Sequence, residues 1–516
     1  MEGLAGLAVV AALLAAVSTF IGVALNWVWF RPKQLEKRLR DQGFSGAPYR
    51  FLQGDSKERA VMERMAKSSP ISLSDDIVPR AAPFLHHTVQ TYGKKSFTWS
   101  GPVPFVNITH PECIKDVFTK HYEITKQNAN PLVKLLATGV ANYEGEKWAK
   151  HRKIINPAFH LEKLKSMVPC FVEGCKGMIR KWEQLSEVEG KCEVDVWPHL
   201  QELASEIISR GAFASNYEEG KRIFDLCKEQ CVLTSQVLQS FYIPGWRFLP
   251  TRTNIRMKQI DKEVKTSLHR MIKRRARRME AGEDRIDDLL GSLMESNQTE
   301  VDGKGKGTEV QMSANDVIEE CKLFYLAGQE TTSSMLVWTM VLLARHQNWQ
   351  TQARNEATEV FGGSIPSFDS LNRLKVIPMI LYETIRLYPP VIQLTRAAQG
   401  VNIREVMLPA GVHISLPIIM VHRDPELWGD DALEFKPERF SGGISKAATK
   451  QISFFPFGGG PRICIGMNFS LLEAKLAIAM ILQRFSFELS PCYVHAPHSV
   501  VTLQPQHGAH FILRRI

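Results

Sequence analysis

A ten-residue loop near the C-terminus limits the fold of this chain, and the kind of ligand it can bind, more than any other segment does. It runs from Phe457 to Gly466 and reads Phe-Gly-Gly-Gly-Pro-Arg-Ile-Cys-Ile-Gly. Cys464 therefore lies among small residues, with Arg462 two positions before it. Glycines let the backbone approach a flat ligand closely and leave peptide N–H groups free to point at a sulfur atom. An arginine at this spacing can bind a carboxylate of the same ligand.

Haem is a flat ligand that has both needs, because its iron requires an axial ligand and its propionates require cations. A thiolate ligand donates electron density to the iron and favours cleavage of the O–O bond. The alternative is an ordinary buried cysteine in a glycine-rich loop. The loop therefore predicts a haem site at Cys464, with the structural cysteine as the alternative.

Residues 313–346 are predicted to form a long helix. Ser313 and Asp316 resemble a capping box ahead of a strongly apolar run. Inside that run, a glycine precedes Glu330 and Thr331; a glycine in a helix costs about 1 kcal/mol relative to alanine, and buried polar groups are also costly. Local loosening of the helix would make room for O₂ and water. The acid and the hydroxyl could then relay protons, whereas the alternative is a helix with an ordinary polar stripe.

Two pairs of side chains each share one face of a predicted helix. Glu383 and Arg386 are three residues apart among apolar neighbours. This favours a buried ion pair over a surface salt bridge, and breaking a buried pair costs roughly 3–5 kcal/mol. Trp148 and Arg152 are four residues apart; taken alone, they indicate an amphipathic helix that carries an aromatic side chain.

These motifs, and their order along the chain, resemble those of the cytochrome P-450 superfamily. The resemblance covers almost the whole length of the chain. In the cysteine loop the positions that match one by one are Phe457, Gly460, Arg462, Cys464 and Gly466. Several further segments are similar to the plant subfamily that includes secologanin synthase. These segments are 43–50, 156–160, 324–332 and 505–509.

The resemblance implies a role for each motif. Cys464 would ligate the iron of heme b (iron protoporphyrin IX), and Thr331 and Glu330 would manage protons. The other cofactor-binding positions that it implies are Trp148, Arg152, Arg396, Phe457, Arg462 and Gly466. Glu383 and Arg386, completed by Arg439, would stabilise the fold near the haem without taking part in the chemistry.

The N-terminus is predicted to be a membrane anchor. Residues 4–30 are almost uninterrupted apolar sequence, and about 20 apolar residues span a bilayer core. The alternative, a cleaved signal peptide, begins with basic residues, but here the basic residues follow the apolar run. The positive-inside rule then places the rest of the chain in the cytosol. We expect an uncleaved anchor at 1–30, a basic juxtamembrane linker at 31–55 and the catalytic domain at 56–516.

Cysteine usage and charge bear on the compartment and the partners. Nine cysteines without regular spacing suit a reducing compartment better than a disulfide framework. A net charge of +10 could indicate nucleic-acid binding, but no nucleic-acid motif accompanies it. We therefore expect no nucleic acid. The densest basic run, 269–278, indicates a solvated helix face, with contact to anionic membrane lipid as the functional alternative. An acidic redox partner is a second reason for a basic surface.

The predicted fold is mainly α-helical with a smaller β lobe, the cytochrome P-450 haem-thiolate fold behind a transmembrane helix. Strands are expected near 96–109 and 391–416, with a C-terminal hairpin near 493–513. The substrate pocket is expected to draw on variable segments, most of them apolar, which favours a hydrophobic ligand. These segments are 131–140, 236–241, 326–327, 391–395 and 500–502.

The resemblance implies a single-pass monooxygenase of the endoplasmic reticulum membrane that faces the cytosol. It would insert one atom of O₂ into a hydrophobic small molecule, such as a plant triterpenoid, iridoid or gibberellin-like compound. Electrons would come from NADPH through NADPH-cytochrome P-450 reductase. Two alternatives stay open: a haem-thiolate isomerase or dehydratase that needs no reductase, and a non-catalytic haem-binding membrane protein.

Overall fold

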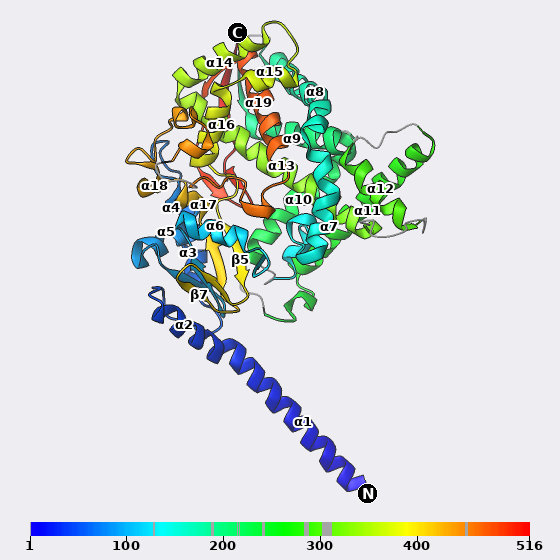
Figure 1. Cartoon of the computed structure of the whole chain (residues 1–516), viewed down its shortest axis with the longest axis vertical. Coiled ribbons are helices and arrows are strands. Elements are labelled where there is room, and N and C mark those ends of the chain that lie inside the picture. The colour runs from blue at the N-terminus through cyan, green and yellow to red at the C-terminus, as the bar shows by residue number, and fades with distance from the viewer. Residues whose placement is uncertain are drawn as a thin grey trace.

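The computed structural model describes residues 2–126, 130–186, 190–213, 215, 217–239, 243–282, 288–301, 312–448 and 453–516. A helical lobe is joined to a smaller lobe of strands, and a long N-terminal helix extends away from both (Figure 1). This arrangement confirms the predicted mainly α-helical fold with a smaller β lobe.

The longer helices of the body are α3 (Ser56–Ser68), α5 (Pro83–Tyr92), α7 (Gly145–Ile155), α8 (Leu161–Leu185), α9 (Val196–Phe213), α10 (Tyr217–Leu238), α11 (Arg252–Glu280), α12 (Leu289–Val301), α13 (Ala314–Arg345), α14 (Gln347–Phe361), α16 (Val376–Leu387) and α19 (Met467–Arg484). The shorter helices are α4 (Val78–Ala81), α6 (Pro111–Thr119), α15 (Phe368–Arg373), α17 (Ile418–Val421) and α18 (Pro425–Trp428). Single 3₁₀ turns occupy Val133–Leu135, Gly139–Ala141, Asn156–Phe159, Trp246–Phe248, Pro437–Phe440, Ile444–Lys446 and Gly460–Arg462.

α13 is the central helix of the larger lobe. The Ser313 hydroxyl accepts the backbone N–H of Asp316, and the Asp316 carboxylate accepts the backbone N–H of Ser313. This capping box confirms the predicted start of the helix. Most side chains from Val317 to Ala344 are buried, and they lie on all faces of the helix. This is expected for a helix that other helices surround.

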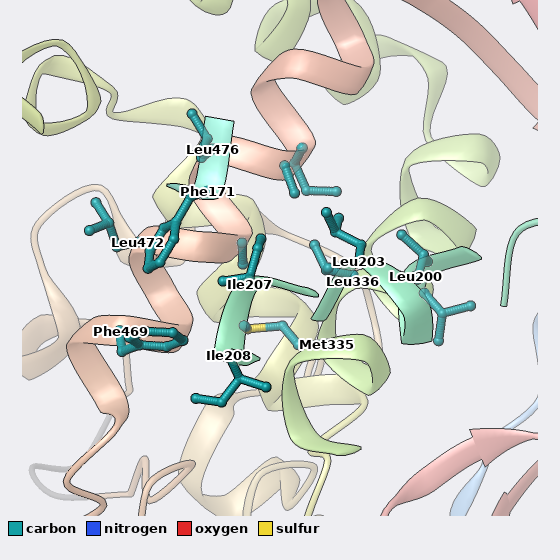
Figure 2. Packing of buried hydrophobic residues seen from close by; sticks show 14 of the residues in the cluster. Phe171, Leu200, Leu203, Ile207, Ile208, Met335, Leu336, Phe469, Leu472 and Leu476 are labelled. Carbon is teal, nitrogen blue, oxygen red and sulfur yellow. The ribbon is translucent and has the colours of Figure 1, made fainter. Parts of the chain in front are cut away.

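The main hydrophobic core fixes α19, which begins three residues after Cys464, against α13. Figure 2 shows Phe171 of α8, Ile207 of α9, Met335 of α13 and Phe469 of α19 meeting in this core. The rings of Phe171 and Phe469 pack edge to face with 4.9 Å between their centroids. The cysteine loop is thereby held beside the central helix.

The smaller lobe is built on a five-stranded sheet of order β1-β2-β8-β5-β3. β2 and β8 run parallel, and the other neighbours run antiparallel. Its strands are β1 (Phe97–Ser100), β2 (Val103–Asn107), β3 (Ile124–Lys126), β5 (Leu394–Ala398) and β8 (His413–Leu416). A small antiparallel pair, β6 (Val401–Ile403) and β7 (Val406–Leu408), joins β5 to β8. The strands expected near 96–109 and 391–416 are therefore present.

The C-terminal hairpin expected at 493–513 is right only in part. β10 (Pro497–Ser499) and β11 (Leu503–Pro505) form a hairpin. β12 (His510–Arg515) instead pairs with β9 (Phe485–Leu489) and with β4 (Lys191–Asp195) in a separate sheet. Its apolar side chains face the helical core there, so burial rather than proximity along the chain decides the pairing.

The N-terminal helix α1 (Glu2–Leu25) continues through a short π-helix at Asn26–Phe30 into α2 (Arg31–Asp41). The apolar run is exposed and is long and apolar enough to cross a membrane. Within the segment expected as a linker, Leu39 is buried in the core of the β lobe. The Tyr49 hydroxyl donates to the carbonyl of Val28 at 2.6 Å. Residues 31–55 therefore pack on the β lobe, and the domain boundaries stay predictions.

Candidate active site

A cavity of about 370 Å³ lies between α13, α7, α9 and the cysteine loop. Its wall is mostly apolar, with cationic side chains gathered in one part. Three segments expected to line the substrate pocket contribute Val140, Ala327 and Val391. Among the described residues, the segments 236–241 and 500–502 contribute nothing to this wall, and residues 240 and 241 lie outside the described chain.

The cysteine loop depends on glycine at its tight turns. Gly458 and Gly460 have φ of +73° and +63°, a region that other residues rarely adopt. A Cβ atom on Gly460 would lie 2.5 Å from the carbonyl oxygen of Phe118. The N–H of Cys464 donates to the carbonyl of Phe457 at 3.0 Å and closes the loop.

Cys464 is exposed and lines the cavity. Burial raises the pKa of the Cys464 thiol, and the Gly466 N–H and the Arg152 guanidinium act in the opposite direction. A Cβ atom on Gly466 would lie 3.9 Å from this sulfur. The loop thus presents one thiol, with a nearby backbone donor, to whatever fills the cavity.

α7 presents two predicted site residues to the cavity. Trp148 lies under the Arg462 guanidinium, whose central carbon is 4.5 Å from the ring centroid. Arg152 Nη1 donates to the carbonyl of Ile463 at 2.9 Å. Both side chains line the cavity, so α7 supports the cysteine loop and borders the site at once.

Arg396 and Arg462 also line the cavity. Arg462 donates to the carbonyl of Tyr143 at 3.0 Å and forms an ion pair with Glu144. The guanidinium of Arg396 is buried and donates to the carbonyl of Thr395 at 2.8 Å. Burial and the neighbouring Arg462 lower the pKa of Arg396 to about 10.

Lys126 is a cavity-lining cation that the sequence did not reveal. It pairs directly with Arg396 across the antiparallel strands β3 and β5. Burial, together with Arg396 and Arg462, lowers the pKa of Lys126 to about 7. Like charges opposite one another in a sheet are destabilising, so this cluster favours an anion in the cavity. No local motif marks Lys126, because its neighbours come from a distant strand.

Thr331 and Glu330 are adjacent in α13 but have different surroundings. The Thr331 hydroxyl lines the cavity and donates to the carbonyl of Ala327 at 2.7 Å. Glu330 is outside the described lining of the cavity and is 3% exposed. Its Oε2 accepts hydrogen bonds from Gln504 at 2.7 Å and Thr502 at 3.1 Å. The sequence placed both side chains at one site, whereas only Thr331 borders it.

The three residues assigned to fold stabilisation meet in the structure. Arg386 and Glu383 are fully buried and paired through two hydrogen bonds. Arg439 Nε lies 3.6 Å from Glu383 Oε1. None of these side chains is in the described lining of the cavity.

The groups around the cavity fit a haem. They are a thiol on one wall, buried cations that suit propionates, and apolar surface for the macrocycle. Arg462 Nε has no partner among the described residues, although it is buried. Fold and site together define the class of haem-thiolate proteins.

Comparison with known proteins assigns the family. The model for "Cytochrome P450" matches residues 81–508, so the chain belongs to the cytochrome P450 family of monooxygenases. Members of this family bind haem through a cysteine thiolate. A solved structure, the retinoic acid bound cyanobacterial CYP120A1, shares the fold with a TM-score of 0.73 at 23% identity, covering 85% of this chain and 96% of that chain.

Several plant proteins are similar over nearly the full length. The chain is 56% identical to Cytochrome P450 72A397 of Kalopanax septemlobus over 95% of each chain. It is 52% identical to the 7-deoxyloganic acid hydroxylase of Catharanthus roseus, again over 95% of each. Secologanin synthase 2 of the same plant is 49% identical, over 99% of this chain and 97% of that protein. These matches confirm the subfamily that the sequence resembled.

Proposed function

We propose that this chain is a membrane-anchored monooxygenase that hydroxylates or oxidatively cleaves a plant terpenoid. The observation that carries the proposal is that Cys464 and the Thr331 hydroxyl line the same apolar cavity. Two relatives are named for a 7-deoxyloganic acid hydroxylase and a secologanin synthase. Their names support an iridoid, and a triterpenoid or a gibberellin-like compound is the alternative. One oxygen atom enters the substrate and the other leaves as water.

Haem, when bound in the cavity, supplies the chemistry of O₂ activation. Cys464 would supply the thiolate ligand, and the Gly466 N–H and the Arg152 guanidinium would stabilise its negative sulfur. The cationic and aromatic groups that line the cavity would hold the propionates, and Phe457 would contact the macrocycle. These groups are Lys126, Trp148, Arg152, Arg396 and Arg462.

Thr331 positions a proton donor beside the substrate. Its hydroxyl hydrogen is engaged by the carbonyl of Ala327, so its oxygen can accept a hydrogen bond from a water in the cavity. Glu330, one residue earlier, resupplies protons from the far side of α13. The apolar wall orients a hydrophobic substrate and excludes bulk water. Glu383, Arg386 and Arg439 hold the fold around this site.

We place α1 in the endoplasmic reticulum membrane, with the catalytic body and its reductase in the cytosol. Basic residues follow the apolar run, which supports this orientation. A second lipid contact is supported by Trp246, Phe248 and Leu249, which are large, apolar and exposed. Protease added to intact microsomes should digest the body and leave luminal proteins untouched. Protection of the body would contradict the orientation.

The reaction is tested with the full-length protein, a plant NADPH-dependent reductase and a terpenoid panel. Substrate-dependent NADPH consumption, with one ¹⁸O atom from ¹⁸O₂ in the product, is the expected result. An isomerase or dehydratase would convert a peroxide without NADPH. A non-catalytic haem protein would show a haem spectrum but no turnover. Either outcome would replace the proposal.

A further inference from the structure

One face of α13 is fastened to β11 and the turn before it. Glu330, Ser334 and Trp338 are spaced four residues apart, so they share that face. Ser334 and Trp338 donate to the carbonyl of Leu503 at 2.7 and 2.9 Å. The N–H of Leu503 donates to the carbonyl of Pro390 at 2.9 Å, one residue before Val391 in the cavity wall. The backbone of β11 is therefore fixed independently of Glu330.

Glu330 is held on this face by two neutral side chains. Thr502 and Gln504 both donate to Oε2, and Gln504 also donates to Thr502 at 3.1 Å. Among the described residues, no side chain makes a salt bridge with Glu330, and no protein group donates to Oε1. One oxygen is therefore tethered, and the other is available to water.

The neighbours of Glu330 leave its charge weakly compensated. The titratable groups that interact electrostatically with Glu330 come from α10. They are Lys228, Cys227 and Cys231. Lys228 itself donates to Gln201 at 3.3 Å. Burial raises the pKa of Glu330, while Thr502, Lys228 and Gln504 act in the opposite direction. A carboxyl group in this setting keeps its proton to higher pH than an exposed glutamate does, and can act as a proton donor.

We propose that Thr502 and Gln504 are positioning residues that hold Glu330 ready to supply protons to the Thr331 side of α13. This rests on the proposed monooxygenase function and on the relay role of Glu330. The two donors fix one carboxylate oxygen on the β11 side, and release of this tether lets the side chain reach the water that Thr331 orients. The strength of the tether then sets how often Glu330 delivers a proton. Because the donors belong to the β10–β11 hairpin, that hairpin governs proton supply without bordering the haem cavity.

The test removes each donor from the full-length enzyme. Thr502→Val and Gln504→Met keep the shape of each side chain but lose the hydrogen bond to the carboxylate, which changes an equilibrium by roughly tenfold. Without the tether, Glu330 delivers protons out of step with the reaction, so product formed per NADPH should fall severalfold and peroxide release should rise. Thr502→Ser keeps the hydroxyl and should restore coupling. Ser334→Ala is the matched control, because Trp338 still holds the Leu503 carbonyl, and it should leave coupling unchanged.

A second readout is independent of turnover. The carbonyl stretch of protonated Glu330 is assigned in the infrared spectrum as the band lost in Glu330→Gln. It should persist to higher pH in Thr502→Val and Gln504→Met, since both lose a donor to the charged form. In the Glu330→Gln background the two substitutions should have no further effect on coupling.

The outcomes separate the tether from the proposed function. If the band and the coupling are unchanged in both variants, the tether does not exist and the inference is overturned. If Glu330→Gln itself leaves coupling intact, Glu330 is not in the relay and the inference falls with it. If the wild type oxidises no terpenoid, the substrate class is wrong, while the infrared band still decides the tether.

Discussion

Glu383 and Arg386 form a fully buried ion pair in which Nε and Nη2 of the arginine each donate to one carboxylate oxygen at 2.7 Å. The arginine also donates to backbone carbonyls of His422, Ala432 and Glu434. α16 is thereby joined to the long irregular segment that leads towards the cysteine loop. Because each donor has an acceptor, the desolvation of both charges is offset by hydrogen bonds.

Glu383→Gln should destabilise the protein strongly. The substitution leaves the Arg386 charge buried without its counter-ion, which costs roughly 3–5 kcal/mol. Urea unfolding of the haem-loaded protein, followed by circular dichroism, measures the change. Glu434→Gln removes an exposed carboxylate paired with Lys436 and should cost less than about 1 kcal/mol. Equal effects of the two substitutions would contradict the role given to the buried pair.

Cys464→His should abolish the red-shifted Soret band of the reduced carbon monoxide complex, which reports thiolate ligation. The imidazole can still bind iron, so haem retention alone is not the criterion. Cys492→His changes another exposed cysteine and should leave the band in place. Retention of the band in Cys464→His would falsify the assignment of the axial ligand.

Local motifs predicted the site residues that are close together in the chain. The loop around Cys464, the pair on α7 and the capping box of α13 each follow from spacing on one element. Lys126 was missed because only the pairing of β3 with β5 brings it opposite Arg396. No pattern within its own strand encodes that neighbour.

Glu330 shows a different limit of the sequence. Its place in an apolar helix indicated a buried acid, and the side chain is 3% exposed. The orientation of the Glu330 carboxylate depends on hydrogen bonds from Thr502 and Gln504, which lie more than 170 positions later in the chain. Helical spacing fixes which face a side chain occupies, but the partner on that face is set by tertiary packing.

Lys126→Met should speed the loss of haem. The lysine is one of the basic side chains that line the cavity, and its removal takes away a partner for a propionate. Transfer of haem to excess apomyoglobin, followed by absorbance, measures the rate. Lys120→Met is the control, because Lys120 is six residues earlier and contacts the carbonyl of Asn402 instead. Identical transfer rates for the two variants and the wild type would exclude Lys126 from the site.

Thr331→Ala should uncouple NADPH consumption from product formation. Haem content and substrate-induced spectral shifts should stay near normal, because the hydroxyl is proposed to orient water rather than to hold haem. Thr339→Ala is the matched control on the same helix, since Thr339 makes the same hydrogen bond, to Met335 at 2.7 Å, outside the described cavity wall. If the variants release peroxide equally, Thr331 has no relay role. If Thr331→Ala fails to take up haem, the residue is structural.

Glu473 in α19 is fully buried, and neither of its carboxylate oxygens has a hydrogen-bond partner among the described residues. It is absent from the described cavity wall, so the proposed reaction does not explain why this acid is buried. Desolvation raises the pKa of Glu473 well above its usual value of 4.5. The folded protein therefore favours the neutral form of this group more strongly than the unfolded chain does.

Glu473→Met should consequently stabilise the protein, by about 1–3 kcal/mol at pH 7, because an unpaired buried polar group is removed. For an acid with a raised folded-state pKa, the stability it contributes is complete below pH 4.5 and is lost as pH rises. The gain in Glu473→Met should therefore be larger at pH 7 than at pH 5. Urea unfolding at both pH values, followed by tryptophan fluorescence, measures this difference. Glu359→Met, at an exposed position of α14, should change stability by less than about 0.5 kcal/mol. A loss of stability in Glu473→Met would contradict this. It would mean that the carboxyl group has a hydrogen-bond partner, such as a buried water, that stabilises the folded protein.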